Sequence, residues 1–328
     1  MEMRQILLVV GGKVMQKFIA RRLLSVIPVV FVVSVVIFTL LKMVPGSPAA
    51  AMLGDLATAD DIAALEAKMG LDRPLVEQYF IWIGNMLHGD FGMSVVGNET
   101  VASVVFSHVK PTISLTLYAL VIATVIAIPM GMLAARKKGT GADHAATVVS
   151  LAGISLPSFL FGLFLMLIFA VKLCLFPVSG YVEMSRGLWP HIRSLTLPAI
   201  ALGFMNAALM MRMTRSTLLE VLGSDYIRMA KAKGVRNVAL VAKHALKNSL
   251  VTIITMIGQS AVQMLAGAAV VESLFAIPGL GQLMVNSIGR RDYYVIQAIV
   301  LLIALFNVLI NIVVDLLYGV ADPRVRAA

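Results

Sequence analysis

The sequence predicts an all-α, polytopic membrane protein with six transmembrane helices. Of the 328 residues, 59% are hydrophobic and only 13% are charged, against about 25% charged in an average soluble domain. Six runs of about 20 apolar residues carry no charge in their interiors, and about 20 helical residues cross the hydrocarbon core of a bilayer. This composition excludes a disordered chain and a soluble enzyme. The single cysteine, Cys174, excludes an internal disulfide and a thiolate metal site.

The six apolar runs are expected to be helices, because a membrane-spanning segment must satisfy its backbone hydrogen bonds internally. Barrel strands would be shorter and would alternate in polarity, which these runs do not. The fourth run is the shortest, and we expect it to extend into the flanking sequence. The runs are Leu23–Lys42, Ile113–Ala135, Val148–Val171, Leu195–Met211, Leu250–Val271 and Tyr294–Val314.

The distribution of Lys and Arg predicts the orientation of the chain. With both termini in the cytoplasm, the inside segments hold eighteen basic residues and the outside segments hold seven, as the positive-inside rule requires. The net charge of +10 is then explained without nucleic acid. We divide the chain into a cytoplasmic segment 1–22, a first transmembrane helix 23–43, an extracytoplasmic helical loop 44–112, a core of five spans at 113–318 and a cytoplasmic tail 319–328.

The long extracytoplasmic loop is expected to contain two short amphipathic helices on the outer membrane face. Thr58 can cap the first helix, which Gly70 would end, and the second would follow Pro74 and end at Gly89. Tyr79 and Trp82 suit a membrane interface. A small cap with no ligand role is the alternative for this loop. The apolar positions at helical spacing are Ile62, Leu65 and Met69, then Leu75, Tyr79, Trp82 and Met86.

The cytoplasmic segment between the fourth and fifth spans is long for a connection between helices. Ser224 or Asp225 can cap a helix over residues 226–233, and Gly234 can end it in a left-handed conformation. A second helix, Val238–Leu246, would return to the membrane. From composition alone, a basic amphipathic helix on anionic lipid headgroups is an equal alternative.

The segment Asp225–Gly234, followed by His244–Asn248, resembles the cytoplasmic EAA loop of binding-protein-dependent ABC importer permeases, in the dipeptide/oligopeptide/nickel branch. Arg228-Met229-Ala230 stands where the broader family has Glu-Ala-Ala, with Gly234 four residues after the last of these. The resemblance covers about residues 15–326. Further stretches that resemble this branch are Gly70–Pro74, His88–Ser94, Pro278–Gly281, Arg291–Tyr294, Asp315–Tyr318 and Asp322–Arg324.

This resemblance implies a permease of the bacterial inner membrane that pairs with a second homologous permease. Two ATP-binding subunits and an extracytoplasmic solute-binding protein would complete the importer. ATP and magnesium would bind the partner ATPases, because this chain has no Walker-type sequence, and the chain itself would need no cofactor and would not be an enzyme. The loop 224–236 would couple to an ATPase through Asp225, Tyr226, Arg228, Met229, Ala230, Lys231, Lys233 and Gly234.

Polar residues are few within the spans, and interhelical hydrogen bonding is favoured for them over lining a pathway. They are Asn206, Gln259, Gln263, Asn307 and Asn311. Arg215 is expected to meet lipid headgroups, while Glu272 and Asp315 are expected to be anchors or caps at span ends. The small residues of the fifth span, among them Gly258 and Gly267, suit close helix packing at an interface between two permeases. The five His residues are scattered without ligand spacing, so no metal site is expected.

Several readings of function remain open from the sequence. Within the same family, import of small peptides, of glutathione, or of nickel or a metal chelate cannot be separated. An ion-coupled secondary transporter would need charged groups inside the membrane, which the spans lack. An intramembrane enzyme would need a buried nucleophile with a base or a metal-binding set, and the spans offer neither. A plain membrane anchor would leave the long cytoplasmic loop unexplained.

Overall fold

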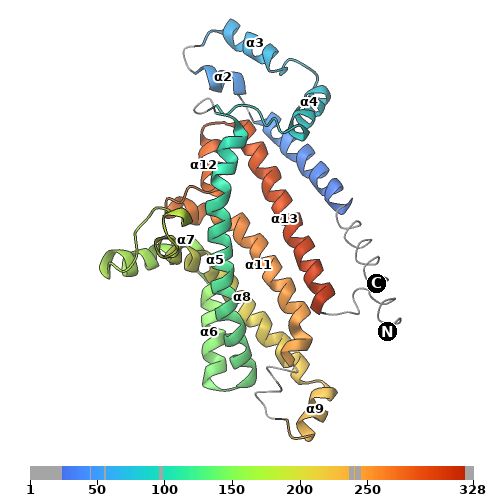
Figure 1. Cartoon of the computed structure of the whole chain (residues 1–328), viewed down its shortest axis with the longest axis vertical. Coiled ribbons are helices and arrows are strands. Elements are labelled where there is room, and N and C mark those ends of the chain that lie inside the picture. Colours follow the sequence, from blue (N-terminus) through green and yellow to red (C-terminus); the bar gives the residue numbers. More distant parts are fainter. Residues whose placement is uncertain are drawn as a thin grey trace. The chain divides into compact units, whose positions relative to one another are not determined.

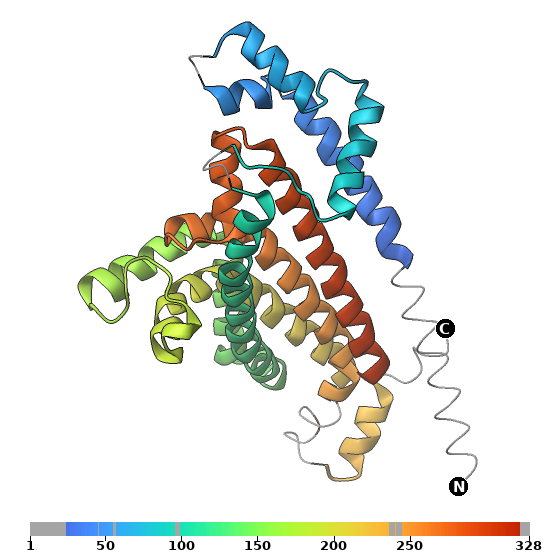
Figure 2. The same cartoon turned by 45° about the horizontal axis from the view of Figure 1, so that its top comes forward.

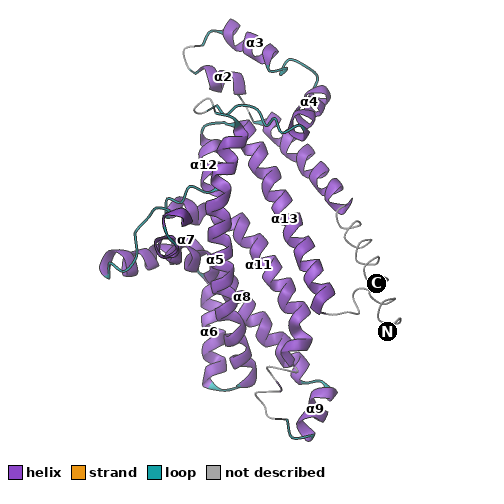
Figure 3. Cartoon of the chain, viewed as in Figure 1, coloured by secondary structure: helices purple, strands orange, loops and turns teal. Residues whose placement is uncertain are grey.

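The computed structural model of the chain describes residues 24–44, 46–54, 57–95, 99–235, 240 and 245–321. Figures 1 and 3 show that these residues form helices joined by loops. One isolated β-bridge, between Met93 and Thr100, occurs among the described residues. The predicted cytoplasmic segment 1–22, most of the predicted helix Val238–Leu246 and the end of the predicted tail lie outside the described residues.

Five helices in the described part of the chain are long and apolar enough to cross a membrane. They correspond to the first, second, fourth, fifth and sixth predicted spans. The fourth extends well beyond its apolar centre at both ends, as expected, and the second begins within the predicted extracytoplasmic loop. The five are the helix Leu24–Met43, α5 (Val101–Arg136), α8 (Leu188–Leu222), α11 (Leu246–Leu274) and α13 (Tyr293–Ala321).

The third predicted span, Val148–Val171, is not one straight helix. It falls on α6 (Gly141–Ser155), α7 (Ser158–Leu165) and a π-helix, η1 (Met166–Lys172), and the chain bends by 106° between α6 and α7 (Figure 2). Pro157 stands at the break. A proline has no N–H to donate and pushes the preceding residue into an extended conformation, and Leu156 has ψ 120°. The described chain therefore has six spans only if this bent pair counts as one.

The remaining helices are short. Two of them, α3 and α4, are the amphipathic helices predicted for the extracytoplasmic loop, and α9 is the helix predicted in the cytoplasmic connection. The other short helices were not predicted. The bounds are α2 (Pro48–Leu53), α3 (Ala59–Lys68), α4 (Leu75–Leu87), η2 (Met184–Arg186), α9 (Asp225–Ala232) and α12 (Leu280–Gly289).

The chain divides into two compact units. One comprises residues 1–110 and 278–308, and the other comprises residues 111–277 and 309–328. In the larger unit α8 is the central helix, since it packs against α6, α7 and α11. Of the residues in an apolar stretch of 18 within α8, 67% are buried. Small residues allow close approach here, and a Cβ on Gly203 would lie 3.0 Å from the backbone oxygen of Ala119 in α5.

The smaller unit has a core of its own. The start of α5 packs against α12 and the first turns of α13 through a cluster of buried apolar side chains. These side chains are Val101, Val105, Leu280, Val295, Ala298 and Ile299. The segment that joins α4 to α5 is thereby fixed to α13, a helix almost 200 residues further along the chain.

Candidate functional site

The helix α9 forms in the connection between the fourth and fifth predicted spans, for which the sequence predicts a cytoplasmic location. Ser224 precedes it with extended backbone, but its hydroxyl donates to the carbonyl of Val221 at 2.5 Å rather than capping the helix. Gly234 has φ +81°, and the N–H of Val235 donates to the carbonyl of Ala230 at 3.3 Å. The predicted end of the helix at Gly234 is therefore confirmed, because this bond across a left-handed glycine is how many helices terminate.

One face of α9 is attached to the membrane-spanning helices. Ile227 is only 3% exposed, and Tyr226 accepts a hydrogen bond at its hydroxyl from the side-chain amide of Asn248 in α11. Met229 lies on the outer side of the helix and is 63% exposed, and Ala230 is half-buried. Asp225, Arg228, Lys231 and Lys233 are all exposed. The helix α9 is thus held on its Tyr226 and Ile227 side, while it presents charged and apolar side chains outward.

The exposed charges of α9 contribute little to its stability. Arg228 and Asp225 form an ion pair at 3.3 Å, but their side chains are 75% and 95% exposed. A solvent-exposed pair of this kind is worth at most about 1 kcal/mol. These side chains are therefore available to a protein that docks on α9 without loss of a structural contact.

Arg215 was expected to meet lipid headgroups, but the structure gives it a partner within the protein. Its guanidinium makes two hydrogen bonds to the carboxylate of Asp143, at 2.5 and 2.9 Å. Asp143 is buried and also accepts from the backbone N–H of Gly139 at 2.9 Å. Sequence reasoning missed the pair because the two residues are 72 positions apart, although Asp143 in the first turn of an otherwise apolar helix was a signal.

Glu272 is also misplaced by the sequence-based prediction. It was expected to be an anchor or a cap at the end of the fifth span, yet its side chain is fully buried and accepts a hydrogen bond from the Thr112 hydroxyl at 2.6 Å. Asp315 is half-buried in α13. A carboxylate near a helix end anchors to solvent only if no neighbouring element covers it, and a single sequence does not reveal that cover.

The polar residues of the spans lie on three helices, α8, α11 and α13. Asn206 is buried in α8, and its side-chain oxygen has no hydrogen-bond partner among the described residues. Gln259 and Gln263 are both exposed on α11, one turn apart. Asn311 is exposed and Asn307 half-buried on α13, and both make polar contacts. Interhelical bonding, favoured from the sequence, thus has no support at Asn206, Gln259 or Gln263 in the described part of the chain.

The first helix of the predicted extracytoplasmic loop, α3, is capped by Thr58 as the sequence predicts. The Thr58 hydroxyl accepts from the N–H of Asp61 at 3.2 Å, and the Asp61 carboxylate accepts from the N–H of Thr58 at 3.1 Å. These hydrogen bonds, with one from the Thr58 hydroxyl, hold the pKa of Asp61 below its usual range. Tyr79 of α4 hydrogen-bonds Ser34 of the first span at 2.8 Å and packs edge-on against Phe38. The helix α4 is therefore attached to the first span.

Two of the motifs that carried the family resemblance pack together in the smaller unit. Asp292 is buried, and its carboxylate accepts from the Ser94 hydroxyl at 2.5 Å and the Val95 N–H at 3.0 Å. Gly92 has φ +84°, and a Cβ there would lie 3.4 Å from the ring of Tyr294. The His88–Ser94 and Arg291–Tyr294 stretches therefore form one structural element.

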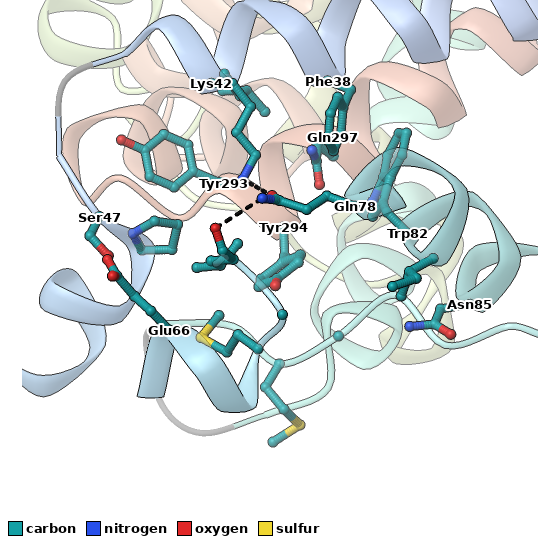
Figure 4. Close-up of a pocket in the computed structure, with 18 of the residues that line it drawn as sticks. Phe38, Lys42, Ser47, Glu66, Gln78, Trp82, Asn85, Tyr293, Tyr294 and Gln297 are labelled. Carbon is teal, nitrogen blue, oxygen red and sulfur yellow. Dashed lines mark hydrogen bonds between the residues drawn. The ribbon is translucent and has the colours of Figure 1, made fainter. Parts of the chain in front are cut away.

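A cavity of about 500 Å³ lies in the same unit (Figure 4). Its walls come from the end of the first span, from α3 and α4, and from the start of α13. Aromatic and charged side chains both line it, among them Phe38, Lys42, Glu66, Trp82, Tyr294 and Gln297. The sequence analysis did not predict this cavity, although Lys42, a charge at the end of an apolar run, was a signal for it. No group of three His, Cys, Asp or Glu that could hold a metal ion occurs among the described residues.

Comparison with known proteins identifies the class. Residues 127–327 match the family described as the binding-protein-dependent transport system inner membrane component, and residues 15–116 match its N-terminal region. The chain belongs to this family. It is a multi-span permease of the ABC transporter type and a transport subunit.

Curated relatives match almost the whole chain. A probable peptide ABC transporter permease, y4tP, of Sinorhizobium fredii is 39% identical, over 94% of this chain and 99% of its own length. The glutathione transport system permease GsiC of Shigella flexneri and the di/tripeptide permease DppB of Pseudomonas aeruginosa are also 39% identical, each over 95% of this chain and 99% of its own length. The inward-facing MetNI methionine ABC transporter has the same fold, with a TM-score of 0.55 and 18% identity over 67% of this chain and 96% of its own.

Proposed function

We propose that this chain forms, with a second permease, the pathway by which an ABC importer carries short peptides across the bacterial inner membrane. A solute-binding protein delivers the peptide outside, and two ATPase subunits hydrolyse ATP inside. Both termini lie in the cytoplasm, as the distribution of Lys and Arg indicates. The proposal of a peptide substrate rests on the relatives named for peptide and di/tripeptide transport.

The observation that carries the coupling role is the exposed face of α9. The helix is anchored at Ile227, yet Met229 and the charged side chains around it face outward. A partner that moves α9 moves α8 as well, because the two helices contact one another and are separated by only two residues. In this proposal α9 sits in a groove of one ATPase, and closure of the ATPases on ATP changes the arrangement of the spans.

A second candidate substrate is glutathione, itself a tripeptide. GsiC is named for glutathione transport and is as similar to this chain as the peptide permeases are. Uptake of labelled dipeptides, tripeptides and glutathione by the same reconstituted importer ranks these substrates directly. Nickel and metal-chelate transport remain predictions of the sequence resemblance alone.

The test is the variant Gly234→Asp in the full importer, reconstituted into liposomes. An aspartate is strained at φ +81°, so the end of α9 is displaced and ATP-driven peptide uptake falls to background. Membrane insertion and complex assembly stay normal. Gly89→Asp is the matched control, since Gly89 also ends a helix, has a left-handed φ of +84° and has open space around it. Normal uptake by Gly234→Asp, with normal ATPase association, overturns the coupling role.

A further inference from the structure

The cavity of the smaller unit has a suitable size for a small solute. Its volume, about 500 Å³, lies within the range of about 300–1,000 Å³ that is usual for small-molecule sites. Every residue that lines it belongs to residues 38–93 or 293–297, so it is formed entirely within one compact unit. By the orientation of the spans, it lies on the extracytoplasmic side.

Lys42 supplies a positioned cation at this cavity. Its ammonium donates a hydrogen bond to the side-chain oxygen of Gln78 and lies 5.7 Å from the centre of the Phe38 ring. Gln78 is buried, and its side-chain N–H groups donate to the carbonyls of Leu71 and Arg73 at 2.9 and 2.7 Å. Those two bonds fix the amide, so that its oxygen must face Lys42 (Figure 4). An ammonium has three N–H donors. The neutral amide of Gln78 orients the Lys42 ammonium with one hydrogen bond and leaves its positive charge in place.

Two buried polar groups on α13 border the same cavity. Tyr293 and Gln297 are 7% and 6% exposed, and they lie one turn apart, on one side of the helix. The Tyr293 hydroxyl and the Gln297 side-chain oxygen have no hydrogen-bond partner among the described residues. Buried polar atoms are nearly always paired. A hydroxyl and an amide beside a cavity suit a ligand with backbone N–H and C=O groups.

The other residues that line the cavity indicate which chemical groups a ligand would need. Trp82 and Tyr294 offer aromatic surface, and Glu66 places a negative charge in the same cavity as Lys42. A ligand that carries a carboxylate, an ammonium, at least one peptide group and an apolar side chain matches this set. We propose that the cavity binds a short peptide, with the carboxylate of the peptide on Lys42 and its backbone against Tyr293 and Gln297.

This inference rests on the proposed peptide transport and adds a site on the permease itself, separate from the solute-binding protein. The experiment measures equilibrium binding of radiolabelled alanyl-phenylalanine and of its C-terminal amide. The sample is the full permease–ATPase complex in lipid nanodiscs, without the solute-binding protein. ATP-driven uptake of the same peptide is measured in parallel with the solute-binding protein present.

Wild type is expected to bind the free carboxylate form about tenfold more tightly than the amide, because the amide oxygen carries no negative charge to pair with the Lys42 ammonium. Lys42→Met is expected to bind the acid about tenfold more weakly and to lose the preference for acid over amide. Lys42→Arg keeps the preference. Lys110→Met is the control, because Lys110 is an exposed lysine of the same unit outside the cavity.

The outcomes are distinct. Binding that Lys42→Met leaves unchanged, or equal binding of acid and amide by wild type, overturns the site. A complex that imports the peptide but shows no binding without the solute-binding protein also overturns the site, while peptide transport stands. A complex that neither binds nor imports the peptide overturns both proposals. A last outcome is that a phospholipid copurifies with wild type and with Lys110→Met but not with Lys42→Met, while peptide binding is the same in all three. That result would assign the cavity to lipid and overturn the inference.

Discussion

The guanidinium of Arg215 in α8 holds the carboxylate of Asp143 in α6 through two hydrogen bonds, of 2.5 and 2.9 Å. Bidentate pairs of this kind are among the strongest polar contacts in proteins. The pair joins α6 near its first turn to α8 near its last turns, and α8 leads directly into α9. It therefore lies on the route by which a movement of α9 would reach the α6 segment of the bent span.

Arg215→Met is expected to lower the melting temperature of the purified chain by several degrees, because it leaves the buried Asp143 carboxylate without its cation. Arg212→Met is the matched control, since Arg212 is an exposed arginine one turn earlier in α8. The charge reversal Asp143→Arg with Arg215→Asp is expected to recover part of the loss. Equal melting temperatures for the two Met variants would show that the pair contributes no stability.

Gly258 of α11 packs directly against Val314 of α13, and a Cβ on Gly258 would overlap the Val314 side chain. Gly258→Ala is expected to destabilise the larger unit by about 1–3 kcal/mol through overpacking. Val314→Ala in the same chain is expected to restore part of that loss by making room. Gly267→Ala is the control, because nothing lies within 4 Å of a Cβ there. Denaturant unfolding in detergent measures all three, and no difference between the two glycine variants would contradict the packing.

Asp292 fastens the 94–95 segment to the start of α13. Asp292→Ala removes the acceptor for the Ser94 hydroxyl and the Val95 N–H, which is expected to cost about 1–3 kcal/mol. Hydrogen–deuterium exchange should then rise at Val95 and its neighbours, while the larger unit is unaffected. Asp72→Ala, at an exposed position of the same unit, should leave exchange at Val95 unchanged. Protection that survives in Asp292→Ala would mean that other contacts hold the segment.

The two faces of α9 should respond differently to the same substitution. Ile227→Asp places a charge at a buried position and is expected to lower the yield of folded chain. Met229→Asp alters an exposed position and is expected to leave the melting temperature unchanged while it weakens association with the ATPases. Crosslinking measures the contact directly, with Met229→Cys in a Cys174→Ser background, which removes the single native cysteine. Full ATPase association of Met229→Asp would exclude this face from the interface.

The sequence predicted the positions of helices well where a long apolar run or a clear helix end marks them. Five spans, the two extracytoplasmic helices and α9 lie where apolar runs, caps and glycines place them. The bend in the third span was not predicted. The residues on both sides of Pro157 are mostly apolar, so composition gives no sign of the break in the helix. The roles of Arg215 and Glu272 depend on which distant side chains approach them. The same holds for the cavity, whose walls come from segments about 200 residues apart.

The contact between Tyr79 and Ser34 has a consequence for the lipid around the protein. Ser34 lies nine residues before Met43, which is about 14 Å along the helix, so α4 is attached close to the midpoint of the first described span. Residues such as Val76, Phe80 and Leu87 of α4 are exposed and apolar. We expect acyl chains beside the first span to cover these side chains. Acyl-chain length thereby becomes a variable that sets how this permease sits in its membrane.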